Sequence, residues 1–121
     1  MAAGDPWEVL VNSLQAGITL EVGPTVLQQL QVNNLDTAAV YVQLHDINAP
    51  EPALGAVPLI NFRVGPNSTL FWTPPNPSAG GAVVGQRFAD GVFVGASSTS
   101  ETWTSTGVAQ LQIYGWGRDS E

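Results

Sequence analysis

The chain has 121 residues and a net charge of −7 near neutral pH, with ten acidic residues, three arginines and no lysine. This charge has the wrong sign for binding a phosphate backbone, so we expect no nucleic-acid partner. The 44% hydrophobic fraction suits a single folded domain, and the absence of cysteine excludes disulfides and thiolate metal ligands.

Residues 1–17 are expected to form a short N-terminal helix. Asp5 suits the cap, Pro6 the first helical position, and Glu8 the third position after the cap, as in a capping box. The apolar residues at the spacing of one helical face are Trp7, Leu10, Val11 and Leu14. A strand over residues 9–14 is the competing interpretation. Because a helix this short is marginal in water, we expect its apolar face to dock, preferably on a neighbouring subunit.

No export or membrane signal is expected in this sequence. The N-terminal segment has neither a basic residue nor the apolar core of a signal peptide. No apolar run approaches the length of about 20 residues that a membrane helix needs. We therefore expect a soluble protein that is made in the cytoplasm and has no membrane partner.

After this segment the apolar residues alternate with polar ones, which predicts strands. Val26, Leu30 and Val32 are expected to share one face of the first strand. The predicted strands lie near residues 26–33, 38–46, 60–64, 68–73, 83–88, 92–97, 102–106 and 109–116. Proline and glycine clusters at 49–58 and 74–81 are expected to be loops. The pattern indicates an all-β fold, an antiparallel β-sandwich of jelly-roll type, as a single domain over residues 18–121.

The sequence offers no recognisable catalytic or metal-binding motif. Its single histidine, His45, is interpreted as an ordinary surface or turn residue, and one histidine cannot supply a zinc site. The acidic residues are scattered over predicted turns and termini, without a calcium-loop pattern. We therefore expect no enzyme activity, no cofactor and no metal. The four tryptophans are interpreted as core or interface residues, and an exposed sugar-stacking platform is the alternative.

The last predicted strand directs Ala109, Leu111 and Ile113 inward and leaves neutral amides and two aromatic residues outward. Only 11% of the residues are charged, so this face lacks the lysine and glutamate of an ordinary solvent-exposed sheet. Such a face can be desolvated against a partner. The candidate interface residues are Trp7, Leu10, Val11, Leu14, Gln29, Gln31, Gln110, Gln112, Tyr114 and Trp116.

Residues 86–94, followed by the Ser/Thr cluster at 96–99 and by Thr102-Trp103-Thr104, resemble a pattern in small virion proteins of tailed phages. Asn33-Asn34 ahead of residues 38–44, and residues 55–58 ahead of the 60–64 strand, match in the same order. The resemblance covers residues 30–116 and brings no catalytic motif. It implies a β-sandwich accessory protein of the virion, made in the cytoplasm of the bacterial host.

The function expected from this resemblance is that of a capsid decoration or head-accessory protein. It would bind capsid or other virion proteins and would form a homo-oligomer, a trimer by analogy with decoration proteins. Edge strands are normally guarded by lysine, which this chain lacks, so packing against a neighbour is one way to protect them. A receptor- or carbohydrate-binding module of a tail fibre is the alternative.

Overall fold

The computed structural model describes residues 5–73 and 85–119, and every element within these ranges is a β-strand. The strands are β1 (Pro6–Gln15), β2 (Gly17–Val22), β3 (Thr25–Asn34), β4 (Val40–Asp46), β5 (Ile60–Val64), β6 (Ser68–Trp72), β7 (Gln86–Phe88), β8 (Gly91–Ser97) and β9 (Leu111–Asp119). The expected all-β fold is thus confirmed. The strand expected at 102–106 is reduced to a bridge between Ser97 and Ser105. The loop expected at 74–81 lies outside the described residues.

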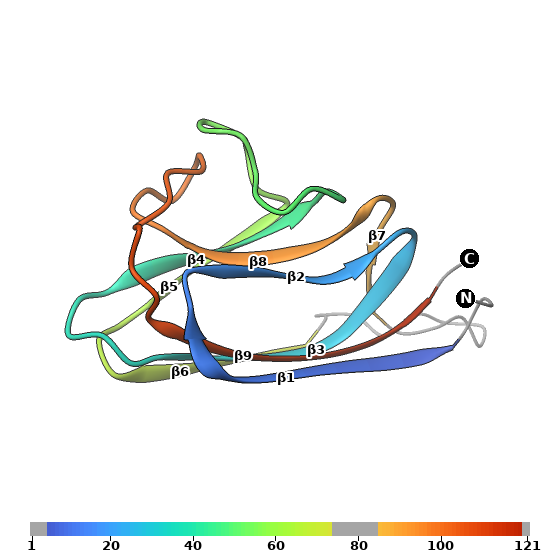
Figure 1. Ribbon diagram of the computed structural model, residues 1–121, viewed down its shortest axis with the longest axis horizontal. Helices are drawn as coiled ribbons and strands as arrows, with labels where there is room; N and C mark the ends of the chain where they lie inside the picture. The colour runs from blue at the N-terminus through green and yellow to red at the C-terminus, as the bar shows by residue number, and fades with distance from the viewer. Residues whose placement is uncertain (1–4, 74–84, 120–121) are drawn as a thin grey trace.

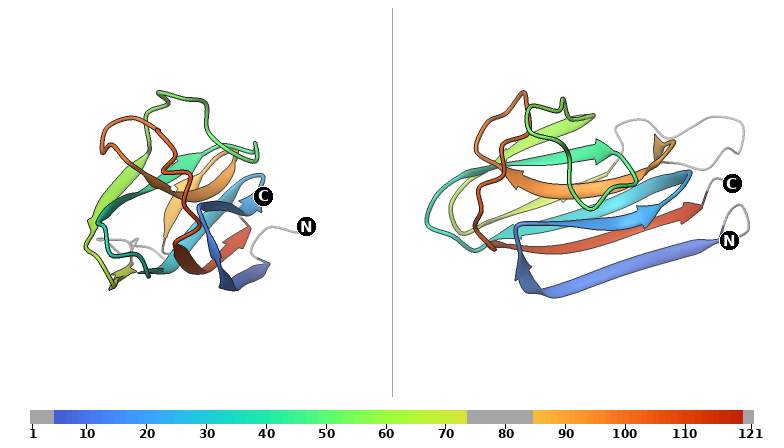
Figure 2. Two further views of the ribbon diagram at one scale, coloured as in Figure 1. Left: turned by 60° about the vertical axis from the view of Figure 1, so that its left-hand side comes forward. Right: turned by 45° about the horizontal axis from the view of Figure 1, so that its top comes forward.

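The strands form two antiparallel sheets that stack face to face (Figure 1). Sheet A has the order β1-β9-β3-β6, and β7 pairs with the first residues of β3, beyond the end of β6. Sheet B has the order β2-β8-β4-β5. Each sheet therefore ends in an edge strand on both sides, and β1 is an edge of sheet A (Figure 2).

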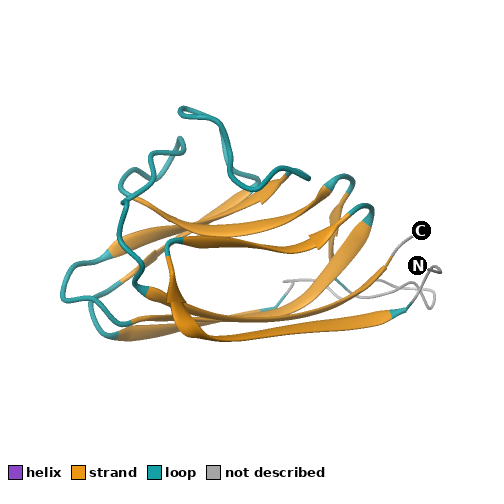
Figure 3. Ribbon diagram, in the orientation of Figure 1, coloured by secondary structure: helices purple, strands orange, loops and turns teal. Residues whose placement is uncertain are grey.

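The N-terminal helix expected over residues 1–17 is wrong, because residues 6–15 form β1 and the described chain contains no helix (Figure 3). β1 pairs with β9 from Pro6 to Val11. The segment also has a period of two: Trp7 and Val9 pack against the core, whereas Leu10 is 55% exposed. Hydrogen bonding to β9 outweighs the local capping signals, since helical propensity is a weak determinant against tertiary contacts.

A bulge at Gln28 changes which side chains of β3 face the core. Leu27 and Gln29 pair with adjacent residues of β9, so Gln28 is left unmatched. Leu27 is fully buried and takes the core position, while Val26 turns to the opposite side of the sheet. The expectation that Val26 shares a face with Leu30 is therefore wrong, because one extra residue shifts the alternation.

The space between the sheets is filled with apolar side chains, and β9 contributes glycine at two of its inward positions. Trp7 lies over Gly115 and Gly117, and its indole Nε1 donates a hydrogen bond to Thr25 Oγ1 at 2.8 Å. A Cβ at Gly117 would overlap this indole and the carbonyl oxygen of Val26. The fully buried core side chains include Leu27, Val32, Val42, Leu44, Phe88, Val92, Val94, Ala96, Leu111 and Ile113.

Candidate functional site

The outer face of sheet A, the side turned away from sheet B, gathers most of the predicted interface residues into rows that cross the strands. Residues paired between neighbouring strands share a face. One row is Leu10, Tyr114, Gln31 and Phe71; the next is Glu8, Trp116 and Gln29; the third is Gln112, Asn33 and Thr69. Glu8 is the single charged residue of these three rows, and the next row of the same face, Pro6, Arg118, Val26 and Arg87, adds two arginines.

Hydrogen bonds hold the polar side chains of this face in place. Asn33 Nδ2 donates to Gln112 Oε1 at 3.1 Å, and Asn33 Oδ1 accepts from Thr69 Oγ1 at 2.9 Å. The hydroxyl of Tyr114 donates to Asn12 Oδ1 at 2.8 Å, and Gln112 Nε2 donates to the carbonyl of Asn12 at 2.9 Å. The amides of Asn33 and Gln112 are thus already paired along the sheet, which lowers the cost of removing water from this part of the surface.

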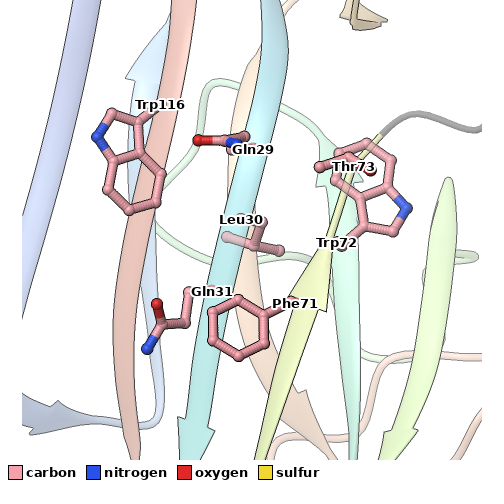
Figure 4. Close-up of a pocket in the computed structure, with 7 residues that line it drawn as sticks. All are labelled: Gln29, Leu30, Gln31, Phe71, Trp72, Thr73 and Trp116. Carbon is pink, nitrogen blue, oxygen red and sulfur yellow. The ribbon is translucent and has the colours of Figure 1, made fainter.

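A shallow groove of about 160 Å³ lies on the same face, between Trp116 of β9 and Phe71 of β6 (Figure 4). Gln29 and Gln31 of β3 lie between the two aromatic side chains. Phe71 is 74% exposed, and Trp116 Nε1 donates to Glu8 Oε2 at 3.2 Å. The lining residues, none of them charged, are Gln29, Leu30, Gln31, Phe71, Trp72, Thr73 and Trp116.

Nine of the ten predicted interface residues are exposed or half-buried, and six of them lie in the rows described above. The six in the rows are Leu10, Gln29, Gln31, Gln112, Tyr114 and Trp116. Trp7 and Val11 are half-buried but face inward, because β1 is a strand. Gln110 is also misplaced: it is 4% exposed and donates to Asn34 Oδ1 at 2.9 Å. Gln110 precedes β9, where the alternation of that strand no longer applies.

Phe71 is a site residue that sequence reasoning missed. Leu70, Phe71 and Trp72 are consecutive apolar residues, so the sequence does not show which of them points outward. Pairing with β3 decides it, because Phe71 lies opposite Gln31 whereas Trp72 lies opposite the buried Leu30.

A second polar cluster lies on the outer side of sheet B, beneath the loop at 98–110. Gln43 is fully buried, and its Nε2 donates to the carbonyls of Thr99 at 2.8 Å and Thr102 at 2.9 Å. Its Oε1 is therefore left to accept a hydrogen bond from His45 Nε2 at 2.8 Å. Trp103 packs edge-on against His45 with a centroid distance of 5.6 Å. The cluster fastens the loop to the sheet.

The interpretation of His45 as a surface histidine is wrong, since the side chain is 2% exposed. Its position on the outer side of β4 was correctly inferred. The sequence did not show that the loop at 98–110 covers this side chain. Burial lowers the pKa of His45 below its ordinary value, because a charged imidazolium would lose its hydration.

Two carboxyl groups meet at one end of the sandwich. Glu21 Oε2 and Asp119 Oδ2 are both buried, and neither accepts a hydrogen bond from an N–H or O–H group of another described residue. Burial, followed by the hydrogen bond and charge of Asp119, raises the pKa of Glu21 to about 7. Glu21 therefore holds its proton up to about neutral pH.

The raised pKa of Glu21 predicts that the free energy of unfolding of the wild-type protein decreases as pH rises from 4.5 to 7. The unfolded chain releases the Glu21 proton near pH 4.5 and the folded chain near pH 7, so the unfolded state binds fewer protons in this window. We expect Glu21→Gln to abolish this loss, which is on the order of 1–2 kcal/mol once the partial exposure of Glu21 is allowed for. Urea unfolding of both proteins from pH 4 to pH 8 measures it.

The difference between wild type and Glu21→Gln isolates the carboxyl pair, because His45 contributes equally to both proteins. His45 acts in the opposite direction: the unfolded state takes up its proton first as pH falls, so its contribution to stability is lost in acid. A difference in unfolding free energy that stays constant from pH 4 to pH 8 would contradict the raised pKa of Glu21.

The described residues contain no group of three or more His, Cys, Asp or Glu side chains placed to hold a metal ion. They also contain no helix able to cross a membrane. The structure thus defines an antiparallel two-sheet protein whose most distinctive surface is the three rows on the outer face of sheet A, which contain one charged residue. No family model matches the sequence, and neither a curated protein nor a solved structure matches the chain.

Proposed function

We propose that the protein is a non-enzymatic structural subunit of a tailed-phage virion, of the capsid-decoration or head-accessory type, that assembles with copies of itself. The strand order supports this proposal. Apart from β7, the eight strands are distributed as 1-9-3-6 and 2-8-4-5, the interleaving expected of two Greek keys in a jelly roll. Jelly rolls are common in viral capsid and lectin domains. The second support is the sequence pattern in residues 30–116, which resembles that of small virion proteins of tailed phages.

The main observation in support of assembly is the open edge of β1. This strand has ten residues, and no described strand pairs with the edge that faces away from β9. Long edge strands are normally protected by lysine or by proline within the strand, but β1 has no lysine, and its proline is its first residue. Leu10 and Leu14 are also 55% and 45% exposed near this edge.

We infer that β1 adds to a sheet edge of a neighbouring copy. Such an addition satisfies the unpaired backbone N–H and C=O groups of β1 and covers Leu10 and Leu14 in cross-strand contacts. It extends sheet A sideways and leaves the outer face of β3 and β6 uncovered, free for a further partner. The expected trimer stays a prediction, and the measured mass of the assembly tests it.

Replacing both Leu10 and Leu14 with lysine is expected to convert the assembly to monomers while the fold is kept. Both side chains are exposed in the single chain, so the substitution leaves the core intact. Two lysines on an edge strand place desolvated charges in the proposed contact, which weakens it by at least about tenfold. Light scattering during size-exclusion chromatography gives the mass, and circular dichroism checks the fold.

The matched control carries the same two added charges on the loop at 47–59, at Leu54 and Val57, which are 82% and 77% exposed. This control is expected to keep the wild-type mass. A β1 variant that retains the wild-type mass, or a wild type that is monomeric at every concentration, would refute assembly through β1.

A further inference from the structure

The two aromatic side chains that flank the groove turn their ring faces outward. Viewed from the outer side of sheet A, Trp116 and Phe71 are both seen face-on rather than edge-on, with Gln29 and Gln31 between them (Figure 4). The indole is held by its hydrogen bond to Glu8, on the side away from the groove. Both ring faces are thus available for stacking, and the orientation of the indole is held by Glu8.

The amides between the rings have hydrogen-bonding groups to spare. The Gln29 amide makes no hydrogen bond to a described residue, and Gln31 uses only its Nε2, toward Asn33 Oδ1 at 3.3 Å. A primary amide offers two donors and a carbonyl acceptor, which match the paired donor and acceptor character of adjacent hydroxyl groups. The floor of the groove is therefore suited to a ligand rich in hydroxyls.

The charge and size of the groove narrow the class of ligand. No charged side chain lines the groove, so it offers no ion pair to a phosphate or an acidic sugar. An engineered cavity of about 150 Å³ holds benzene, so a groove of about 160 Å³ has room for one six-membered ring. The ligand that fits is a neutral ring with one apolar face and hydroxyls at its rim.

The two stacking positions are far enough apart for a chain of such rings. Trp116 and Phe71 lie on strands separated by β3 and differ by one outward step along the sheet. Standard strand spacing and rise place their Cα atoms about 12 Å apart. A flat surface of this length favours an extended chain over a compact one.

We propose that this groove binds a neutral, extended, β-1,4-linked glycan, with one sugar in the groove over Gln29 and Gln31 and the sugars on either side of it stacked on Trp116 and Phe71. This binding goes beyond the structural role proposed above and is independent of it, since each chain carries a complete groove. Assembly through β1 would leave the grooves open and display several of them together, which raises avidity without any new contact.

The test is isothermal titration calorimetry of the full-length protein with cellohexaose and chitohexaose, two neutral β-1,4-linked glycans. Maltohexaose, a neutral glycan of more compact shape, serves as the comparison. We expect at least one β-1,4-linked glycan to bind more tightly than maltohexaose. Phe71→Ala and Trp116→Ala are each expected to weaken binding by at least about tenfold, the effect of losing one stacked ring. Leu54→Ala, which removes an exposed apolar side chain elsewhere, should bind as wild type.

Absence of heat for all three glycans at millimolar concentration would overturn the proposal, as would binding that survives both aromatic substitutions. Phe71 is 74% exposed, so Phe71→Ala remains informative even if Trp116→Ala disturbs the sheet. Light scattering on the same samples separates the two proposals. A monomer that binds glycan contradicts assembly alone, and an oligomer that binds none contradicts the glycan site alone.

Discussion

Replacing Gln43 with glutamate is expected to lower the free energy of unfolding by about 3–5 kcal/mol, the cost of a buried charge without a partner. The side chain is fully buried, and its Nε2 holds the carbonyls of Thr99 and Thr102. A carboxylate oxygen in its place would face these carbonyls with a negative charge and no proton to donate. The loop at 98–110 would lose its attachment to sheet B.

Urea unfolding at pH 8 measures this effect, since His45 is then neutral and cannot pair with the new carboxylate. Gln29→Glu is the matched control: it makes the same chemical change at an exposed position whose amide bonds to no described residue. We expect the control to stay within about 0.5 kcal/mol of wild type. Equal unfolding free energies for the two variants would show that Gln43 does not secure the loop.

Gly117→Ala is expected to destabilise the protein by about 2–3 kcal/mol, at the upper end of the cost of overpacking a core. The added Cβ overlaps the indole of Trp7 and the carbonyl oxygen of Val26. The indole is held by Thr25, and the carbonyl belongs to the backbone of β3, so neither can move without disturbing sheet A. The pairing of β1 with β9 should weaken first.

Gly65→Ala is the control for this substitution. The nearest atom to a Cβ at Gly65 is Ser68 Oγ at 3.4 Å, an ordinary contact. Thermal unfolding of both variants gives the comparison, and Gly65→Ala should remain near wild type. A Gly117→Ala protein as stable as wild type would mean that Trp7 does not pack against β9 as described.

The strands of this protein could largely be predicted from the sequence because most have one core face and one polar face. The alternation that predicted the 38–46 and 60–64 strands matches β4 and β5, and it placed Gln112, Tyr114 and Trp116 correctly on the outer side of β9. Such patterns are local, and burial of one face enforces them.

The errors arise where the deciding contact is distant in the sequence. Trp7 and Val11 fit a helical face as well as a strand, and only pairing with β9, about a hundred residues away, selects the strand. The bulge at Gln28 has no local signal. Gln110 and His45 read as surface residues, because neither Asn34 nor the loop at 98–110 is recognisable as their partner in the sequence.

The candidate site was predicted only in part, again because some of the deciding contacts are distant in the sequence. The outward amides and aromatic residues of β3 and β9 follow from the alternation within these strands. The groove also needs Phe71, and the sequence does not show which of three consecutive apolar residues points outward. The open edge of β1 could not be predicted from a segment interpreted as a helix.

The central proposal is that this protein is a subunit on the surface of a phage particle. A density map of intact virions of the phage that encodes the protein tests it most directly. We predict density for the two-sheet domain at symmetry-related positions on the particle, with β1 against a neighbouring copy and the Trp116–Phe71 groove facing outward. Purified particles that lack the protein, or that enclose it without regular placement, would contradict the claim.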